Sequence, residues 1–170
     1  HNQEEAMTVA DDLAIIDSGE LVETGRTIEL YENPLRRFTA DFIGENNIFD
    51  GRGTRIDGAE VTLDLGYGAV TVHSRGQAVR VGDDASISVR SERLRIFDTD
   101  GKVEDSFHYL STTHMETVYL GLTTSEIVML PDGKEVMVRR LSDGIENAGF
   151  THGAEIRIGW RKADGRLHMS

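Results

Sequence analysis

The chain has 170 residues, 38% of them hydrophobic and 28% charged, a balance typical of a soluble globular protein of one or two small domains. Its formal net charge is −12, which disfavours nucleic acid binding because such binding normally needs a basic footprint. No segment approaches the ~20 apolar residues of a membrane-spanning helix, and the first residues do not read as a signal peptide. Cysteine is absent, which excludes disulfides and thiolate metal sites.

The first 45 residues carry helical and hairpin patterns. Asn2, with Glu5 three positions later, is a capping-box signature and predicts a helix that follows at once. Hydrophobic runs at 13–16 and 21–22, separated by a turn at 17–19, predict a small β-hairpin. We then expect a short helix at 28–32, and a second helix that starts at Asn33-Pro34 with the proline in its first turn.

These elements are too few to bury a core, so residues 1–45 look like part of a larger domain. We therefore expect apolar side chains to be exposed there, in a segment that is partly disordered or paired with a second copy. The side chains concerned are Leu13, Ile15, Ile16, Phe38 and Phe42.

From residue 46 onward the hydrophobic pattern changes to period two, with Gly- and Asp-rich turns between short runs. Apolar residues alternate in this way at 61–65, 70–72, 87–89, 127–129 and 156–160. Short strands at this spacing predict a mainly β domain over 46–170, a small antiparallel barrel or sandwich.

The β region also contains pairs of similar sequence runs, which we call the internal echo. The runs at 61–72 return at 127–138 with an offset of 66, and those at 82–90 return at 153–161 with an offset of 71. We interpret these as two related β-units, roughly 46–100 and 103–170, that pack together. The alternative is that strands of small barrels resemble one another without a repeat.

The beginning of the chain resembles the switch-histidine region of the ATP-binding subunits of ABC-type importers. In that family a histidine-aspartate-glutamine-x-glutamate-alanine-methionine run precedes a helix that ends in alanine-aspartate. The matching segments of this chain are 1–7, 10–11, 15–19, 22–25, 29–34 and 38–46, and they look most like the spermidine/putrescine group.

The resemblance continues into the β region. Val89-Arg90-Ser91-Glu92 is similar to a valine-arginine-proline-glutamate step of the family, with Ser91 in place of the proline, and Tyr119-Leu120-Gly121 resembles a second marker. In the family this region is a small OB-type barrel called the TOBE domain. The resemblance thus implies an ATPase-domain remnant at 1–45 and a TOBE-like regulatory domain at 46–170.

For the N-terminus, the resemblance implies that His1 is the switch histidine, which contacts the γ-phosphate of ATP in the intact subunit. A histidine just before a helix start is well placed for this, since the helix N-terminus favours phosphate oxygens. Asn2 stands where the family has aspartate, and it caps a helix equally well. ATP and Mg²⁺ are expected only in the parent subunit, with no cofactor for this stretch alone.

The other ATPase motifs are not found in these 170 residues. There is no G-x-x-x-x-G-K-[ST] phosphate loop, no LSGGQ-type signature and no hydrophobic strand ending in aspartate-glutamate. Phosphoryl transfer depends on positioning by many groups, so we expect no ATP hydrolysis by this chain alone.

The resemblance also implies partners and a location. A second copy of the subunit would meet the β-domain, with Trp160 and Tyr119 as candidate anchors, and the membrane subunits of the transporter would bind the parent. The expected location is the cytoplasmic face of the inner membrane, with a polyamine as the transported substrate.

The alternative is a free-standing OB-type module that binds a small ligand or an oxyanion. Residues 91–93 and 139–140 could line a groove for it, although such charges are more often ordinary turn and strand-face residues. For the histidines at 73, 108, 114, 152 and 168 we expect surface or core positions and no metal site.

Overall fold

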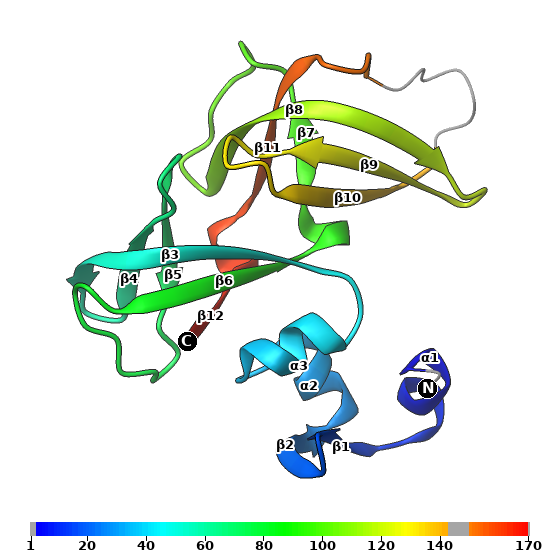
Figure 1. Ribbon diagram of the computed structural model, residues 1–170, viewed down its shortest axis with the longest axis vertical. Helices are drawn as coiled ribbons and strands as arrows, with labels where there is room; N and C mark the ends of the chain where they lie inside the picture. Colours follow the sequence, from blue (N-terminus) through cyan, green and yellow to red (C-terminus); the bar gives the residue numbers. More distant parts are fainter. Residues whose placement is uncertain (1–2, 143–149, 170) are drawn as a thin grey trace.

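The computed structural model describes residues 3–142 and 150–169, which form three stacked groups of elements (Figure 1). Three short helices and a hairpin lie at one end, one five-stranded sheet lies in the middle, and a second five-stranded sheet lies at the other end. No helix of the described ranges is long and apolar enough to cross a membrane.

The N-terminal group is small and only partly self-contained. Its elements are α1 (Gln3–Val9), β1 (Asp12–Asp17), β2 (Glu20–Arg26), α2 (Thr27–Glu32) and α3 (Arg37–Phe42). The antiparallel pairing of β1 with β2 confirms the predicted hairpin. Its buried core is a cluster of three side chains: Ile15, Leu30 and Ile43.

The start of α3 differs from the prediction. The helix begins at Arg37 and not at Asn33-Pro34. The reason is tertiary, because the Glu23 carboxylate on β2 accepts the backbone N–H groups of Leu35 and Arg36 at 3.0 and 3.1 Å. These bonds hold the segment extended just before the helix, and Arg36 itself makes no side-chain cap.

The expected apolar exposure of this segment holds for most of the named residues. Ile16, Phe38 and Phe42 are exposed, with the two phenylalanine rings stacked 5.8 Å apart. Ile15 and Leu13 differ from the expectation: Ile15 packs with Leu30 and Ile43 inside the N-terminal group, and Leu13 is half-buried against this cluster.

The middle sheet has the strand order β12-β6-β3-β4-β5, and all its pairs are antiparallel. Its strands are β3 (Asn46–Asp57), β4 (Glu60–Asp64), β5 (Ala69–His73), β6 (Asp84–Arg90) and β12 (Arg166–Met169). The other sheet has the order β10-β9-β8-β11-β7, again with antiparallel pairs. Its strands are β7 (Arg95–Phe97), β8 (Phe107–Tyr119), β9 (Thr123–Met129), β10 (Glu135–Leu141) and β11 (Glu155–Arg161).

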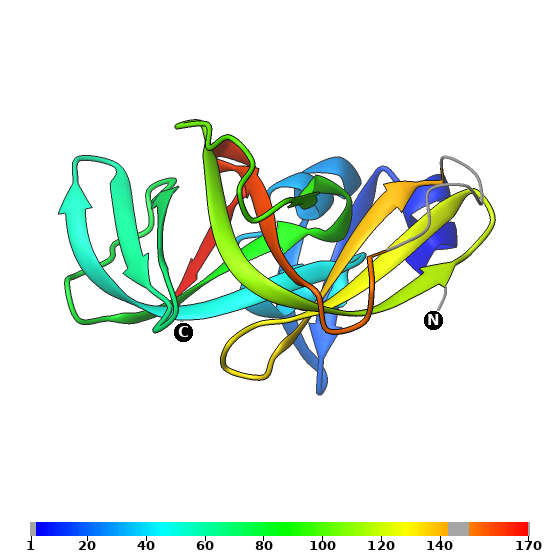
Figure 2. The ribbon, with the colours of Figure 1, turned by 90° about the horizontal axis from the view of Figure 1, so that it is seen from above.

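The two sheets repeat one design, so the echo in the sequence is a structural repeat. In each sheet one long strand pairs with two others. The first half of β3 pairs with β6 and its second half with β4, while the first half of β8 pairs with β11 and its second half with β9. A register shift interrupts each long strand near its middle. Seen from above, the β4–β5 hairpin and the turn between β8 and β9 lie at opposite ends of the molecule (Figure 2).

The repeats exchange their last strands. Strand β6 leads through a 3₁₀ turn, Ser91–Arg93, into β7, which pairs with β11 of the other sheet. Strand β11 leads through the turn Lys162–Asp164 into β12, which returns to pair with β6. Each sheet is therefore completed by the other repeat, which makes the two units one folding body.

The hydrophobic core shows that the two units fold together, and it corrects the expectation that Trp160 is an anchor for a second subunit. A single hydrophobic cluster contains side chains from both sheets, and the ring of Trp160 stacks on Phe49 at 5.1 Å. Only 1% of Trp160 is exposed, so it is a core residue and not an anchor for another subunit. The mainly β, OB-like fold class is confirmed.

Candidate functional site

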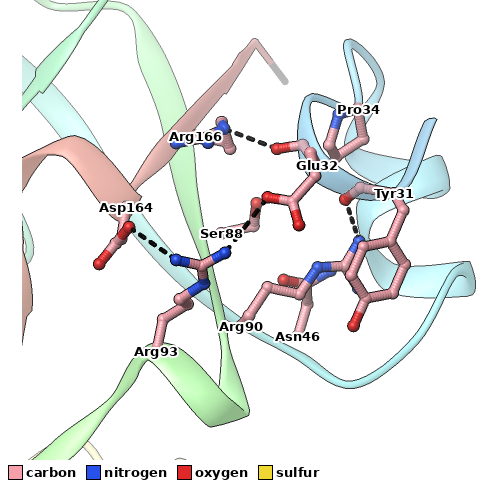
Figure 3. A pocket seen from close by; sticks show the side chains of 9 residues that line it. All are labelled: Tyr31, Glu32, Pro34, Asn46, Ser88, Arg90, Arg93, Asp164 and Arg166. Carbon is pink, nitrogen blue, oxygen red and sulfur yellow. Dashed lines mark hydrogen bonds and ion pairs between the residues drawn. The ribbon is translucent and has the colours of Figure 1, made fainter. Parts of the chain in front are cut away.

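The most elaborate polar cluster of the described residues lies where helix α2 meets the middle sheet (Figure 3). We call it the joint. It surrounds a cavity of about 70 Å³. The lining residues are Tyr31, Glu32, Pro34, Asn46, Ser88, Arg90, Arg93, Asp164 and Arg166.

Arg90 is the most deeply buried charged residue of the joint. It ends strand β6, and only 7% of it is exposed. Its guanidinium donates to the backbone carbonyls of Tyr31 and Ile43 and lies over the ring of Tyr31, 3.7 Å from the centroid. Burial lowers the pKa of Arg90 from its usual value, so these contacts replace the water that the cation loses.

Arg166 holds the same end of α2 from the exchanged strand β12. Its Nε donates to the Glu32 carbonyl at 2.8 Å and to the Asn33 side-chain oxygen at 3.1 Å. Arg75 donates to that same Asn33 oxygen at 2.6 Å. Burial, with a further contribution from the nearby Arg75 cation, lowers the pKa of Arg166.

These contacts supply what α2 lacks. The last carbonyls of a helix have no partner within it and carry partial negative charge. Helix α2 has no basic residue in its last turn, so the cations that complete it come from the β-domain. The joint is therefore a set of polar contacts that connects the N-terminal group to the middle sheet.

Three arginines and two carboxylates line the cavity, and both carboxylates pair with Arg93. Arg93 lies 3.5 Å from the Glu32 carboxylate and 3.7 Å from that of Asp164 (Figure 3). An anion entering the cavity would face these two carboxylates, and a cation would face Arg90 and Arg166. The geometry favours a structural connection over an ion site.

Two further contacts join the N-terminal group to the β region. Arg37 of α3 forms an ion pair with Asp50 of β3. Burial opposes ionisation of Asp50, but hydrogen bonds from Arg37 and Lys134 outweigh it and lower its pKa. Ser91, at the position where the resemblance has proline, donates its backbone N–H to the Glu45 carbonyl at 3.0 Å, a bond that proline cannot make.

A wider cleft of about 400 Å³ separates α1 from the β-domain. It contains two of the side chains considered as groove residues, Glu92 and Arg139. Arg139 pairs with Glu45 at 2.7 Å, and Glu92 accepts the hydroxyl of Tyr31 at 3.0 Å. Burial raises the pKa of Tyr31, and the Glu92 charge raises it further.

Two of the histidines, His114 and His168, are core residues, and His108 is half-buried. His168 is bonded to Ser88 at 2.8 Å, His108 to the Thr71 carbonyl at 2.7 Å, and His114 to the Glu126 carboxylate at 3.0 Å. Burial lowers the pKa of His108 and of His168. Within residues 3–142 and 150–169, no group of three or more His, Asp or Glu side chains could hold a metal ion.

Arg140 of the second candidate pair reaches into the core from its strand. Its Nη2 lies 2.9 Å from the buried Glu126 carboxylate, which also accepts the hydroxyl of Thr117. Burial disfavours the charged carboxylate, but these bonds, together with the one from His114, lower the pKa of Glu126. Both arginines of this pair therefore form ion pairs.

Of the site residues proposed from the sequence, His1 lies outside the described residues. Tyr119 is exposed at the tip of the β8–β9 hairpin. The importance of Arg90 and Arg166 was missed, because their partners are carbonyls 47 to 134 positions away and no local motif marks them.

Comparison with known proteins agrees with this architecture. The protein-family model described as "TOBE domain" matches residues 87–167. The chain is 32% identical over 162 residues to the spermidine/putrescine import ATP-binding protein PotA of Rubrobacter xylanophilus, which covers 94% of this chain and 41% of that protein. It is 33% identical over 139 residues to the PotA protein of Pseudomonas fluorescens, covering 82% of this chain and 36% of that one.

A solved structure shares the fold. The cytoplasmic molybdate-binding protein ModG, with molybdate bound, superposes with a TM-score of 0.65 at 19% identity, covering 76% of this chain and 99% of that chain. The chain spans less than half the length of the import proteins that it matches. With its TOBE domain and its alignment to those proteins over nearly all its residues, the chain belongs to the family of ABC-type import ATP-binding proteins.

Proposed function

We propose that the chain is the C-terminal regulatory and dimer-contact portion of the ATP-binding protein of an ABC importer for polyamines. The observation that carries the proposal is the alignment of 94% of the chain with a spermidine/putrescine import ATP-binding protein. The joint supports it, because it ties a small N-terminal group with little core of its own to a complete β-domain.

In this proposal the two parts have different tasks. Residues 1–45 belong to the ATPase domain, and residues 46–170 form the regulatory domain. ATP and Mg²⁺ bind the ATPase domain of the intact protein, to which this chain contributes His1 as a donor to the γ-phosphate. Without a phosphate loop, the chain does not hydrolyse ATP by itself.

The partners are a second copy of the same subunit and the membrane subunits of the transporter, at the cytoplasmic face of the inner membrane. The exposed apolar side chains of the N-terminal group, among them Ile16, Phe38 and Phe42, support a further covering domain. The net charge of −12 argues against nucleic acid as a partner.

The test is ATP turnover by the intact subunit with His1→Ala. We expect kcat to fall by about 100-fold, the order found when one donor to a developing charge is removed, while ATP affinity changes little. Unchanged turnover would contradict the assignment of His1. Turnover by the 170-residue chain alone would contradict its proposed role.

The alternative is a free-standing module that binds a small ligand or oxyanion. The specific feature in its favour is the trio of Arg90, Arg93 and Arg166 around one cavity. Calorimetric titration of the chain with molybdate, sulfate and phosphate decides this. Saturable binding that Arg93→Gln abolishes would support the alternative, whereas the two carboxylates already paired with Arg93 lead us to expect no binding.

A further inference from the structure

Gln3, at the start of α1, is bonded to the segment that leads into the β-domain. Its Nε2 donates to the Phe42 carbonyl at 2.6 Å, and its Oε1 accepts the N–H of Gly44 at 3.2 Å. The two ends of one side-chain amide thus satisfy both a donor and an acceptor of the loop Phe42–Gly44. A residue near the beginning of the chain is thereby fixed to a loop about 40 positions away.

The opposite side of the same loop is held by the joint. Arg90 donates to the Ile43 carbonyl, between the two groups that Gln3 binds. Gly44 has a φ of +69°, and a Cβ at this position would lie 2.5 Å from Arg90 Nη1 and 3.0 Å from the ring of Tyr31. The loop therefore lies between Gln3 and the buried Arg90 and cannot shift without disturbing one of them.

The surroundings of α1 give the helix room to follow such a shift. The cleft of about 400 Å³ lies directly between α1 and the β-domain, lined by Met7 and Thr8 on one side and by Glu92 and Arg139 on the other. Met7 also packs against the core of the N-terminal group, and the bonds of Gln3 join α1 to the loop Phe42–Gly44 beside this cleft.

We propose that Gln3, the loop Phe42–Gly44 and Arg90 form a mechanical link by which the β-domain sets the position of α1. This helix begins two residues after His1 in the sequence. On the proposed function, on which this inference rests, the link lets the arrangement of the β-domain control ATP turnover through the switch histidine. Gln3 is a positioning residue, which acts through α1 and does not touch ATP.

The link predicts an effect on turnover without an effect on ATP affinity. Gln3→Glu keeps an oxygen that accepts the Gly44 N–H but places a carboxylate against the Phe42 carbonyl in place of the donor. Gln77→Glu is the matched control, because Gln77 Nε2 donates to the Leu167 carbonyl at 2.7 Å inside the β-domain. In the intact subunit we expect Gln3→Glu to lower kcat about 10-fold with KM for ATP nearly unchanged, and Gln77→Glu to leave both unchanged.

A double-mutant cycle tests whether the loop carries the effect. Arg90→Lys keeps the charge but removes the two-pronged grip on the Tyr31 and Ile43 carbonyls. If Gln3 and Arg90 act through one loop, the double variant should turn over no more slowly than the slower single variant. Effects on kcat that simply multiply would overturn the link, as would equal losses for Gln3→Glu and Gln77→Glu.

Amide hydrogen exchange of the intact subunit separates this proposal from the function on which it rests. Arg90→Lys should speed exchange in the peptides that cover α1 about 10-fold, whereas the exposed-site control Arg52→Lys should not. Unchanged exchange in α1 would overturn the link whatever the ATPase assays show. If α1 responds but His1→Ala retains full turnover, the link stands and the role of His1 is wrong.

Discussion

Single residues of the joint depend on backbone positions that tolerate little else. Gly44 turns the chain with a positive φ directly against the Arg90 guanidinium. Gly133 has a similar φ of +88°, but a Cβ there would meet nothing within 4 Å. The two glycines share a conformational requirement and differ only in the available space.

We therefore expect Gly44→Ala to cost more than Gly133→Ala. Both variants should lose about 1 kcal/mol of unfolding free energy because alanine disfavours the left-handed backbone. Gly44→Ala must also displace Arg90, so its total loss should be about 2–3 kcal/mol. Urea denaturation of both variants measures the difference in the free energy of unfolding. Equal losses would show that Arg90 yields without cost.

His168 gives the fold a pH dependence of known sign. Burial lowers its pKa below the ordinary 6.5 in the folded chain, so the unfolded chain binds the proton first as the pH falls. Stability is then lost as the pH falls through 6.5 toward the folded pKa, with a slope of at most about 1.4 kcal/mol per pH unit. His168→Gln should unfold with a shallower pH dependence between pH 7 and 5, and an unchanged dependence would contradict the assignment.

At the scale of elements, the exchange of β7 and β12 decides which parts of the chain stabilise each other. Leu167 of β12 is buried in the shared core, although its strand is paired with β6, where its partner Ile87 lies 80 positions earlier. Strand β11, its close neighbour in sequence, lies in the other sheet. A substitution that destabilises β12 should therefore also destabilise segments far from it in the sequence.

Leu167→Ala tests this arrangement. We expect a loss of about 3 kcal/mol in the free energy of unfolding, as for other buried leucines. Hydrogen exchange should rise first in β6, whose edge β12 covers, and less in β8 and β9. A loss of protection confined to β11 and its sheet would contradict the exchanged pairing.

At the scale of the whole molecule, an exposed apolar region lies at the far end of the second sheet. Tyr119, Leu120 and Leu122 are exposed at the β8–β9 hairpin, with 86% of Leu122 accessible, and Leu141 ends the neighbouring strand β10. Trp160 is buried, so this hairpin is the remaining candidate, of the two aromatic anchors named from the sequence, for the contact with a second copy.

Sedimentation equilibrium of the chain tests that contact. If the hairpin carries it, Leu122→Ser should weaken self-association about 10-fold, whereas Val103→Ser, which changes another exposed aliphatic residue, should not. A wild-type chain that is monomeric at high concentration would contradict the dimer-contact role itself.

Local patterns in the sequence determined much of this protein. Alternation of apolar residues predicted the antiparallel β class, a turn between two short runs predicted the β1–β2 hairpin, and the echo predicted two related units. These features depend on periodicity and turn chemistry, which neighbouring residues fix. The division of the chain at 45/46 and the role of His1 remain predictions.

Tertiary structure alone decided the rest. The exchange of β7 and β12, the start of α3 under the Glu23 carboxylate, and the burial of Trp160 against Phe49 all depend on partners far away in sequence. The joint has the same origin, because the carbonyls at the end of α2 offer the same acceptors whatever the local residues are. Which arginine reaches a carbonyl is settled only when the two repeats have folded together, and no local pattern records it.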